Sequence, residues 1–452
     1  MIEFLSKNSI YATLINSIKP HEKLTVFGCD LDAKLTILND TGKFLLFVTS
    51  DVKEAVNIKE KLTETGYRVE SLTEKLNYNL NPFDNEYNEK VLKVLNKVLN
   101  GEIDALIVNP MFLHYKLPNV EWLRAKTIHL SSGVKKEPDE LVKQLVNAGF
   151  TREEYVEKDG QFSLKGDCVE FVSDEAYRVY FDFDVIEKIK VFNIETRINE
   201  KDVDEINIGN ACWIENTEDI IKSVKDDEEK QKLVEFEDKL NNMIWCSPFC
   251  EYINDNIVNY LPEDAVVCFT DNKLTYTYLQ EEVKAYNKCM LDMPAHKKMV
   301  VKDVLNLGDV PVVGFQYITN SNRLFTTTKV FNLKCVPVPN YRGQYKLLGS
   351  DLSNLKSKKY TIVIYVKNKE GYNRISTLLE ANNLTYNNIG ALSFATTGEI
   401  NLVTKRFGMS VNLELDKVLV LGSGNLFGVA KPILKASAKN ETSDFLPQTG
   451  DY

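Results

Sequence analysis

The sequence has little of what marks a membrane protein, a secreted protein or a protein that coats nucleic acid. Its 452 residues contain no uninterrupted apolar run near the ~20 residues that span a bilayer. Residues 1–4 lack the basic and apolar regions that begin a signal peptide. Lysine and arginine number 55 against 65 aspartates and glutamates, and the net charge of −10 repels a phosphate backbone. We therefore expect a cytoplasmic protein that neither enters a membrane nor tracks DNA nonspecifically.

Clustered metal ligands and catalytic histidines are also missing from the sequence. The eight cysteines are scattered, which indicates reduced thiols rather than a disulfide framework. Cys246 and Cys250 stand four apart, but no second pair and no nearby histidine completes a zinc site. The four histidines are equally scattered. We therefore expect no metal, no cofactor and no catalytic constellation built from these residues.

Composition and patterning indicate about three globular domains of the α/β class. Hydrophobic residues make up 44% and charged residues 27%, as in ordinary soluble proteins. Apolar runs such as 44–48 and 105–108 are continuous, which is typical of parallel strands buried on both faces. Amphipathic helical patterns stand between them. Residues 1–130 are therefore predicted to form the first part of a parallel-sheet domain, and similar runs predict its second part in 208–349.

The region between these two parts has a different period. Residues 161–165 and 168–171 alternate between apolar and polar side chains, and Gly166–Asp167 offers a tight turn between them. This pattern predicts a hairpin, and two further strands follow it. We expect a small α+β domain at 131–207 whose sheet has one apolar and one solvated face.

The remaining segments are predicted more simply. Residues 350–440 are expected to form a small α/β domain, and the polar residues 441–452 a linker. The charged stretch 226–239 favours a solvated helix over a binding tail, because opposite charges recur there at helical spacing.

One loop stands where a nucleotide-binding P-loop would stand in such a sheet. It runs from Gly28 to Leu35, and only Gly28 and Lys34 match the pattern G-x-x-x-x-G-K-[ST]. Ala33 replaces the closing glycine, and Leu35 replaces the hydroxyl that would hold Mg²⁺. An α/β domain that never bound nucleotide would also explain a lone glycine and lysine.

Acidic residues add to the case against nucleotide binding. Asp30 and Asp32 place two carboxylates beside the position of a triphosphate, and a like-charge pair ~4 Å apart costs about 4 kcal/mol at an effective dielectric near 20. Thr270 and Asp271 end the strand that would carry the magnesium-binding acids, but Asn272 follows and no glutamate is adjacent. We therefore predict that the loop is a vestige that does not bind ATP.

An ordered pattern over about 50 residues carries a family resemblance. It comprises residues 149–152, 160–171, 177–181 and 186–196. The pattern resembles the UvrB-homology region of bacterial transcription-repair coupling factors (Mfd). That region has a Gly-aromatic-x-Arg turn, a Gly-x-Phe-x-x-Arg-Gly-Asp hairpin, an Arg-hydrophobic-Glu-Phe-Phe strand and an Ile-Glu-x-Ile-Arg-x-Phe-Asp strand.

The resemblance implies a fold and a function. The fold would be a UvrB/helicase-like parallel-sheet domain with a degenerate P-loop, split by the inserted domain at 131–207 and followed by the small α/β domain. The function would be that of a non-catalytic scaffold, the N-terminal part of a coupling factor, which recruits UvrA of nucleotide excision repair. RNA polymerase and DNA would be contacted only through regions beyond Tyr452, where the ATPase motor would also lie.

The resemblance also implies which residues contact UvrA. They are Arg152, Phe162, Lys165, Arg178 and Tyr180. The alternation predicts that Lys165, Arg178 and Tyr180 point to the solvated face of the sheet. The family has arginine at the position of Lys165, and a lysine lacks the bidentate fork toward carboxylates.

An enzyme is the alternative hypothesis. The same strand, loop and helix around Lys34 would suit an active ATP-dependent UvrB-like protein that loads or unwinds DNA. Titration with nucleotide and Mg²⁺ distinguishes the two hypotheses, because only the enzyme binds ATP with micromolar affinity.

Overall fold

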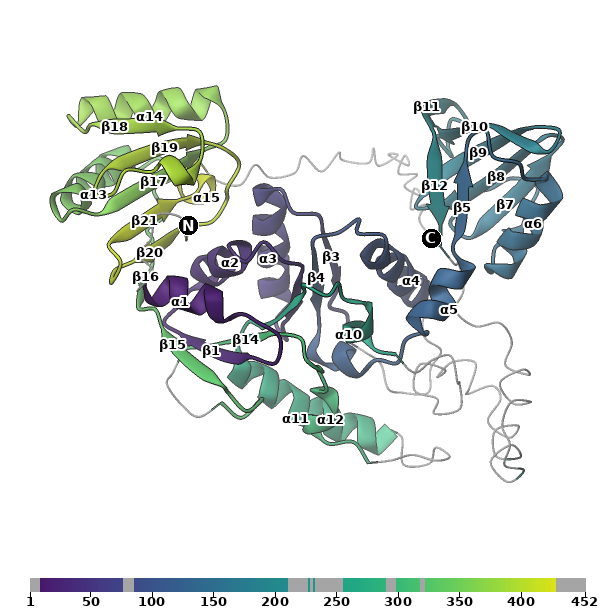
Figure 1. Cartoon of the computed structure of the whole chain (residues 1–452), viewed down its shortest axis with the longest axis horizontal. Coiled ribbons are helices and arrows are strands. Elements are labelled where there is room, and N and C mark those ends of the chain that lie inside the picture. The colour runs from purple at the N-terminus through teal and green to yellow at the C-terminus, as the bar shows by residue number, and fades with distance from the viewer. Residues whose placement is uncertain are drawn as a thin grey trace, which may run out of the picture.

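The computed structural model describes residues 9–75, 85–209, 255–289, 298–317 and 322–427, with the single positions 227 and 231. The linker expected at 441–452, the pair Cys246 and Cys250, and most of the charged stretch 226–239 lie outside these residues. Within them, a central α/β domain carries a small sheet domain on one side and a third domain on the other (Figure 1). No helix of the described residues is long and apolar enough to cross a membrane.

A seven-stranded parallel sheet forms the central domain. Its strands, in the order β15-β1-β14-β13-β2-β4-β3, are β1 (Lys23–Phe27), β2 (Leu45–Val48), β3 (Val69–Leu72), β4 (Ala105–Val108), β13 (Val266–Phe269), β14 (Val312–Gln316) and β15 (Lys329–Asn332). All neighbouring strands are parallel. The predicted α/β class with a parallel sheet is therefore confirmed. The chain leaves this sheet after β4 and returns to it at β13, so both parts of the sequence contribute strands.

Helices cover both faces of this sheet and explain its continuous apolar strands. One face packs with α1 (Ile10–Ser17), α2 (Leu31–Asn39) and α3 (Val52–Thr65), and the other with α4 (Asn85–Leu99), α5 (Val120–Lys126), α10 (Ile257–Tyr260), α11 (Asn272–Cys289) and α12 (Val301–Val304). Helix α3 shows how the sequence places these elements. Asp51 accepts hydrogen bonds from the N–H groups of Lys53 and Glu54, and Gly66 ends the helix in the left-handed conformation.

The small sheet domain has six strands in sequence order. They are β6 (Thr151–Arg152), β7 (Gln161–Lys165), β8 (Cys168–Ser173), β9 (Glu175–Asp182), β10 (Val185–Phe192) and β11 (Asn199–Val203). Helix α6 (Pro138–Asn147) packs on the apolar face. A separate pair, β5 (Ile128–Ser131) and β12 (Glu205–Ile208), lies where the chain enters and leaves the domain (Figure 1). Strand β11 has no apolar alternation from which it could be predicted, because its side chains are almost all solvent-exposed.

The third domain has a six-stranded sheet in the order β16-β20-β21-β17-β19-β18. Its elements are β16 (Cys335–Val336), α13 (Tyr345–Ser357), β17 (Thr361–Val366), α14 (Lys369–Ala381), β18 (Tyr386–Ile389), β19 (Ile400–Thr404), β20 (Val411–Leu413), β21 (Val418–Leu421) and α15 (Ser423–Leu426). Helix α13 spans the boundary expected between residues 349 and 350, and β16 already belongs to this sheet.

The third domain shares a hydrophobic core with the central domain. Val363, Met409 and Val420 of its sheet lie in one buried cluster with Leu35 of α2 and Ile58 of α3. Polar contacts reinforce the junction. The Ser410 N–H donates to Asp32 Oδ2 at 3.1 Å, and the Ser423 hydroxyl donates to Glu64 Oε1 at 2.9 Å. The two domains therefore pack as one continuous body through α2 and α3.

Candidate protein-binding surface

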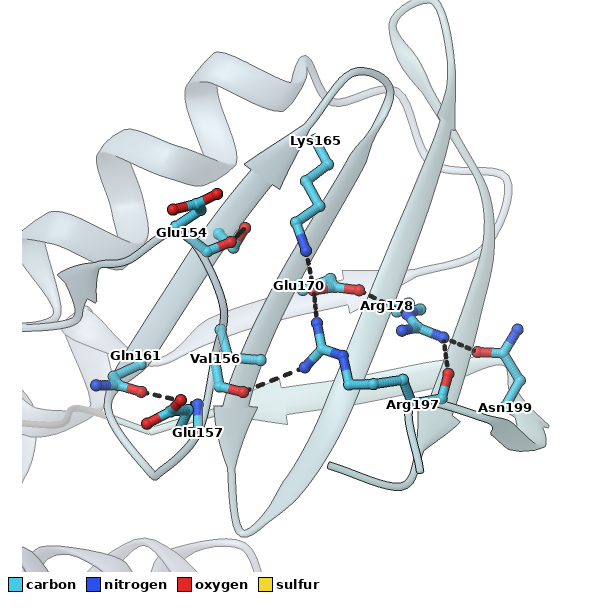
Figure 2. Close-up of polar contacts among 10 residues, drawn as sticks. Glu154, Val156, Glu157, Gln161, Lys165, Glu170, Arg178, Arg197 and Asn199 are labelled. Atoms are coloured by element: carbon cyan, nitrogen blue, oxygen red, sulfur yellow. Dashed lines mark hydrogen bonds and ion pairs between the residues drawn. The ribbon is translucent and has the colours of Figure 1, made fainter. Parts of the chain in front are cut away.

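A buried glutamate organises the solvated face of the small sheet. Glu170 on β8 is 4% exposed. Arg178 Nε donates to its Oε1 at 2.7 Å, and an Nη of Arg197 donates to its Oε2 at 2.5 Å. Lys165 Nζ lies 3.4 Å from the same Oε2, so the lysine and Arg197 converge on the carboxylate (Figure 2). We call these four residues the Glu170 cluster. Its three cations surround a single carboxylate, which leaves the cluster net positive.

Strand register brings three members of the cluster together. Glu170 on β8 stands directly opposite Arg178 on β9. Glu170 also stands opposite Ser163, so Lys165 is its diagonal neighbour on β7, within reach of a long side chain. Arg197 comes from the connection between β10 and β11, where its φ of 59° lies in the left-handed region. The sequence pattern therefore accounts for the three strand residues but not for Arg197.

The two arginines of the cluster are held in place by further contacts. An Nη of Arg178 donates to the Arg197 carbonyl at 2.9 Å and to Asn199 Oδ1 at 2.8 Å, and Arg197 donates to the Val156 carbonyl at 3.1 Å (Figure 2). Both guanidinium groups lie over the ring of Phe192, at 4.1 and 4.9 Å from its centroid. Such contacts fix the direction of each guanidinium, so less side-chain conformational entropy is lost when a partner binds.

The electrostatics of the cluster keep its carboxylate charged. Burial by itself raises the pKa of Glu170, but the hydrogen bond from Arg178 and the charges of the three cations outweigh it and hold this pKa below its ordinary value. Lys165 Nζ also lies 4.0 Å from the ring centroid of Tyr155, which is exposed. The surface therefore offers positive charge beside an aromatic ring, on a rigid base.

The five predicted contact residues differ in how far a partner could reach them. Arg152 is exposed on β6, and Lys165 is exposed at the end of β7. Arg178 is mostly buried within the cluster, and Tyr180 is half-buried with Lys188 Nζ 5.1 Å from its ring centroid. Of these five residues, only Lys165 and Arg178 belong to the described contacts around Glu170.

The burial of Phe162 contradicts its predicted role as a contact residue. Its side chain is fully buried in the apolar cluster beneath α6, together with Phe171 and Leu141. The period of two explains this placement, because Phe162 shares the apolar face of β7 with Leu164. A side chain in this position supports the sheet from behind and cannot contact a partner on the solvated face.

Phe183 is a residue that the sequence analysis missed. It forms the turn between β9 and β10, is 91% exposed and has a φ of 54°. A bulky residue in the left-handed region is uncommon and costs energy. The alternation could not have identified it, because Phe183 is in phase with the buried Val179 and Phe181 and is exposed only because β9 ends at Asp182.

The Gly28–Leu35 loop uses its polar groups internally. Asp30 accepts a hydrogen bond from the Ala33 N–H at 2.9 Å, so a carboxylate occupies the helix N-terminus where a phosphate would bind. Lys34 is 3% exposed, and its Nζ donates to the Thr270 carbonyl at 2.7 Å and lies 3.7 Å from Glu54 Oε1. Each of these groups already has a partner within the chain.

A later segment of the chain also packs against this loop. The N–H of Leu333 donates to the Phe27 carbonyl at 3.2 Å, and the N–H of Cys335 donates to the Gly28 carbonyl at 2.8 Å. A Cβ on Gly28, whose φ is 74°, would approach the backbone nitrogen of Lys334 to 3.0 Å. Glycine is therefore required here for close packing of two backbone segments, without any phosphate.

Comparison with known proteins locates the Glu170 cluster within a described family region. The UvrB interaction domain matches residues 128–212. Over most of its length the chain is similar to transcription-repair-coupling factors. It is 20% identical over 477 residues to that of Bacillus subtilis, which covers 94% of this chain and 40% of the relative. It is 21% identical over 411 residues to that of Staphylococcus aureus, which covers 81% and 35%. The chain thus spans less than half the length of these relatives.

Proposed function

We propose that the chain binds UvrA through the solvated face of the small sheet. The reason is that the chain corresponds to the N-terminal region of transcription-repair coupling factors. In this role it is a non-catalytic scaffold that recruits nucleotide excision repair to a stalled RNA polymerase. RNA polymerase and DNA would be contacted through regions of the relatives that this chain does not span.

The Glu170 cluster is the observation that carries the proposal. It lies within the residues matched by the UvrB interaction domain. Protein interfaces are enriched in arginine and aromatic side chains, and the strongest contacts are those on rigid, partly desolvated supports. Arg178 and Arg197 meet this description, and Lys165 beside Tyr155 extends the surface. The net positive charge suits carboxylates on the partner.

Charge reversal at two exposed residues of the small sheet, Lys165 on the solvated face and Arg152 on the edge strand β6, tests the proposal. Lys165→Glu combined with Arg152→Glu is expected to weaken UvrA binding at least 10-fold, about 1.4 kcal/mol, because attraction to partner carboxylates becomes repulsion. Titration calorimetry with purified UvrA measures the effect. Lys143→Glu is the matched control, since Lys143 is exposed on α6 behind the sheet. Equal affinities for the double variant and the control would refute this surface.

The enzyme hypothesis makes a different prediction, which Lys34 can test. If this lysine binds phosphate, Lys34→Ala abolishes ATP binding and leaves the stability of the fold unchanged. We expect the reverse: no saturable binding of Mg²⁺-ATP by the wild type, and a loss of about 2 kcal/mol of stability in the variant. The reason is that the variant leaves the Thr270 carbonyl and Glu54 without their cation. Calorimetry with ATP and thermal unfolding of both proteins provide the two readouts.

A further inference from the structure

Two free cysteines lie side by side at the junction of the central and third domains. Cys29 and Cys335 are separated by 306 positions in sequence, yet their Sγ atoms lie 3.7 Å apart. Cys29 follows Gly28 in the loop after β1 and is 5% exposed, whereas Cys335 begins β16 and is partly exposed. Both thiols are free.

The backbone around both cysteines is anchored. The N–H of Cys335 donates to the carbonyl of Gly28 at 2.8 Å, so the two chain segments are already in direct contact. Cys335 also pairs with Leu413 on β20, inside the sheet of the third domain. Formation of a disulfide requires the two sulfur atoms to move about 1.7 Å closer, to the 2.05 Å of an S–S bond.

We propose that Cys29 and Cys335 form a covalent modification site, a redox-active pair that a peroxide closes to a disulfide and that thereby links the third domain to the Gly28–Leu35 loop. This inference is independent of UvrA binding. The disulfide would give a role to the contact between residues 333–335 and the loop. At this contact the segment that enters the third domain packs against the Gly28–Leu35 loop.

The reaction balances with hydrogen peroxide as the oxidant. The more accessible Cys335 gives up its proton, attacks the peroxide and cleaves the O–O bond to become a sulfenic acid. The hydroxide that leaves takes up that proton and is released as the first water. Cys29 Sγ then attacks the sulfenic sulfur, and the displaced hydroxide takes the proton of Cys29 and leaves as a second water. Two thiols and one peroxide yield one disulfide and two waters. A thiol donor reverses the reaction by exchange.

The burial of Cys29 and the partial exposure of Cys335 support this order of events. The hydrogen bond with Cys335 and burial both raise the pKa of the Cys29 thiol, so it stays protonated until its partner has reacted. Cys168 and Cys268, the two other cysteines whose side chains the structure describes, are not within hydrogen-bonding distance of another sulfur. Disulfides in reducing compartments are usually transient and redox-sensing, which fits a pair that is reduced at rest.

Peptide mapping of the oxidised chain tests the proposal. The native full chain is treated with equimolar hydrogen peroxide, digested without reductant and analysed by mass spectrometry. We expect a linked peptide containing Cys29 and Cys335 that dithiothreitol separates. Oxidation should also raise the melting temperature by roughly 5 °C or more, because a cross-link across 306 positions restrains the unfolded chain.

Matched variants make the test decisive. Cys335→Ser should abolish both the linked peptide and the rise in melting temperature, and Cys168→Ser should retain both. The proposal is overturned if the two cysteines of the native protein stay reduced, if each is oxidised separately to a sulfinic acid, or if the link forms only in urea. It is also overturned if Cys335→Ser is stabilised by peroxide as strongly as the wild type.

Discussion

Replacing Glu170 with alanine is expected to lower the free energy of unfolding of the small sheet domain by about 3–5 kcal/mol. The substitution removes the carboxylate that Arg178, Arg197 and Lys165 share, and it leaves like charges close together on a buried support. Hydrogen exchange of the β8 and β9 amides measures the loss locally. Glu187→Ala is the control, because Glu187 is exposed on the same sheet and should change stability by less than about 0.5 kcal/mol.

The contribution of Glu170 should also depend on pH. The folded state holds the pKa of this carboxyl below the ordinary value of 4.5. Its stabilising effect is therefore fully present above pH 4.5 and is lost as the pH falls through the lower folded pKa. The difference in stability between wild type and Glu170→Gln should shrink over that acidic range. A difference that stays constant down to pH 2 would show that the pairing does not control stability.

Replacing Phe183 with glycine is expected to weaken UvrA binding about 30-fold while leaving the domain as stable as before or more stable. A solvent-exposed aromatic ring at a hairpin turn suits a pocket on a partner, and loss of such an anchor costs about 2 kcal/mol. Glycine adopts the left-handed conformation of this position without the strain that phenylalanine bears. Affinity and stability are thus predicted to change in opposite directions.

Calorimetry with UvrA and thermal unfolding of the same preparations give the two values. The control is Val146→Ser, because Val146 is exposed on α6 behind the sheet. Serine is used in place of glycine, which would weaken the helix. Unchanged affinity in Phe183→Gly would remove the hairpin turn from the proposed interface. A fall in stability that matches the fall in affinity would assign the residue a structural role.

The strands of the small sheet could be predicted because their side chains alternate, but the contacts of the Glu170 cluster could not. Alternation places Lys165, Glu170 and Arg178 on one face. Glu170 also pairs with Arg197, which lies in the connection between β10 and β11, outside the alternating strands. Phe162 shows the converse, since its place in the alternation indicated the core while the family pattern suggested a contact residue.

The Gly28–Leu35 loop shows a similar limit. Its mismatches to a P-loop could be read from residue types, but the partners of Lys34 come from Thr270 and Glu54, on elements far apart in the sequence. The docking of the third domain was also beyond prediction. Apolar residues of α2 and α3 indicated burial without indicating that a second sheet would cover them.

The most direct test of UvrA binding by the solvated face is a hydrogen-exchange footprint of the complex. The full chain is measured alone and with saturating UvrA. We predict slowed exchange in β7, β8, β9, the turn that carries Phe183 and the 193–198 loop that carries Arg197, with no change in α6 or in the Gly28–Leu35 loop. Binding of UvrA that leaves these strands unprotected, or that protects α6 instead, would contradict the proposed function.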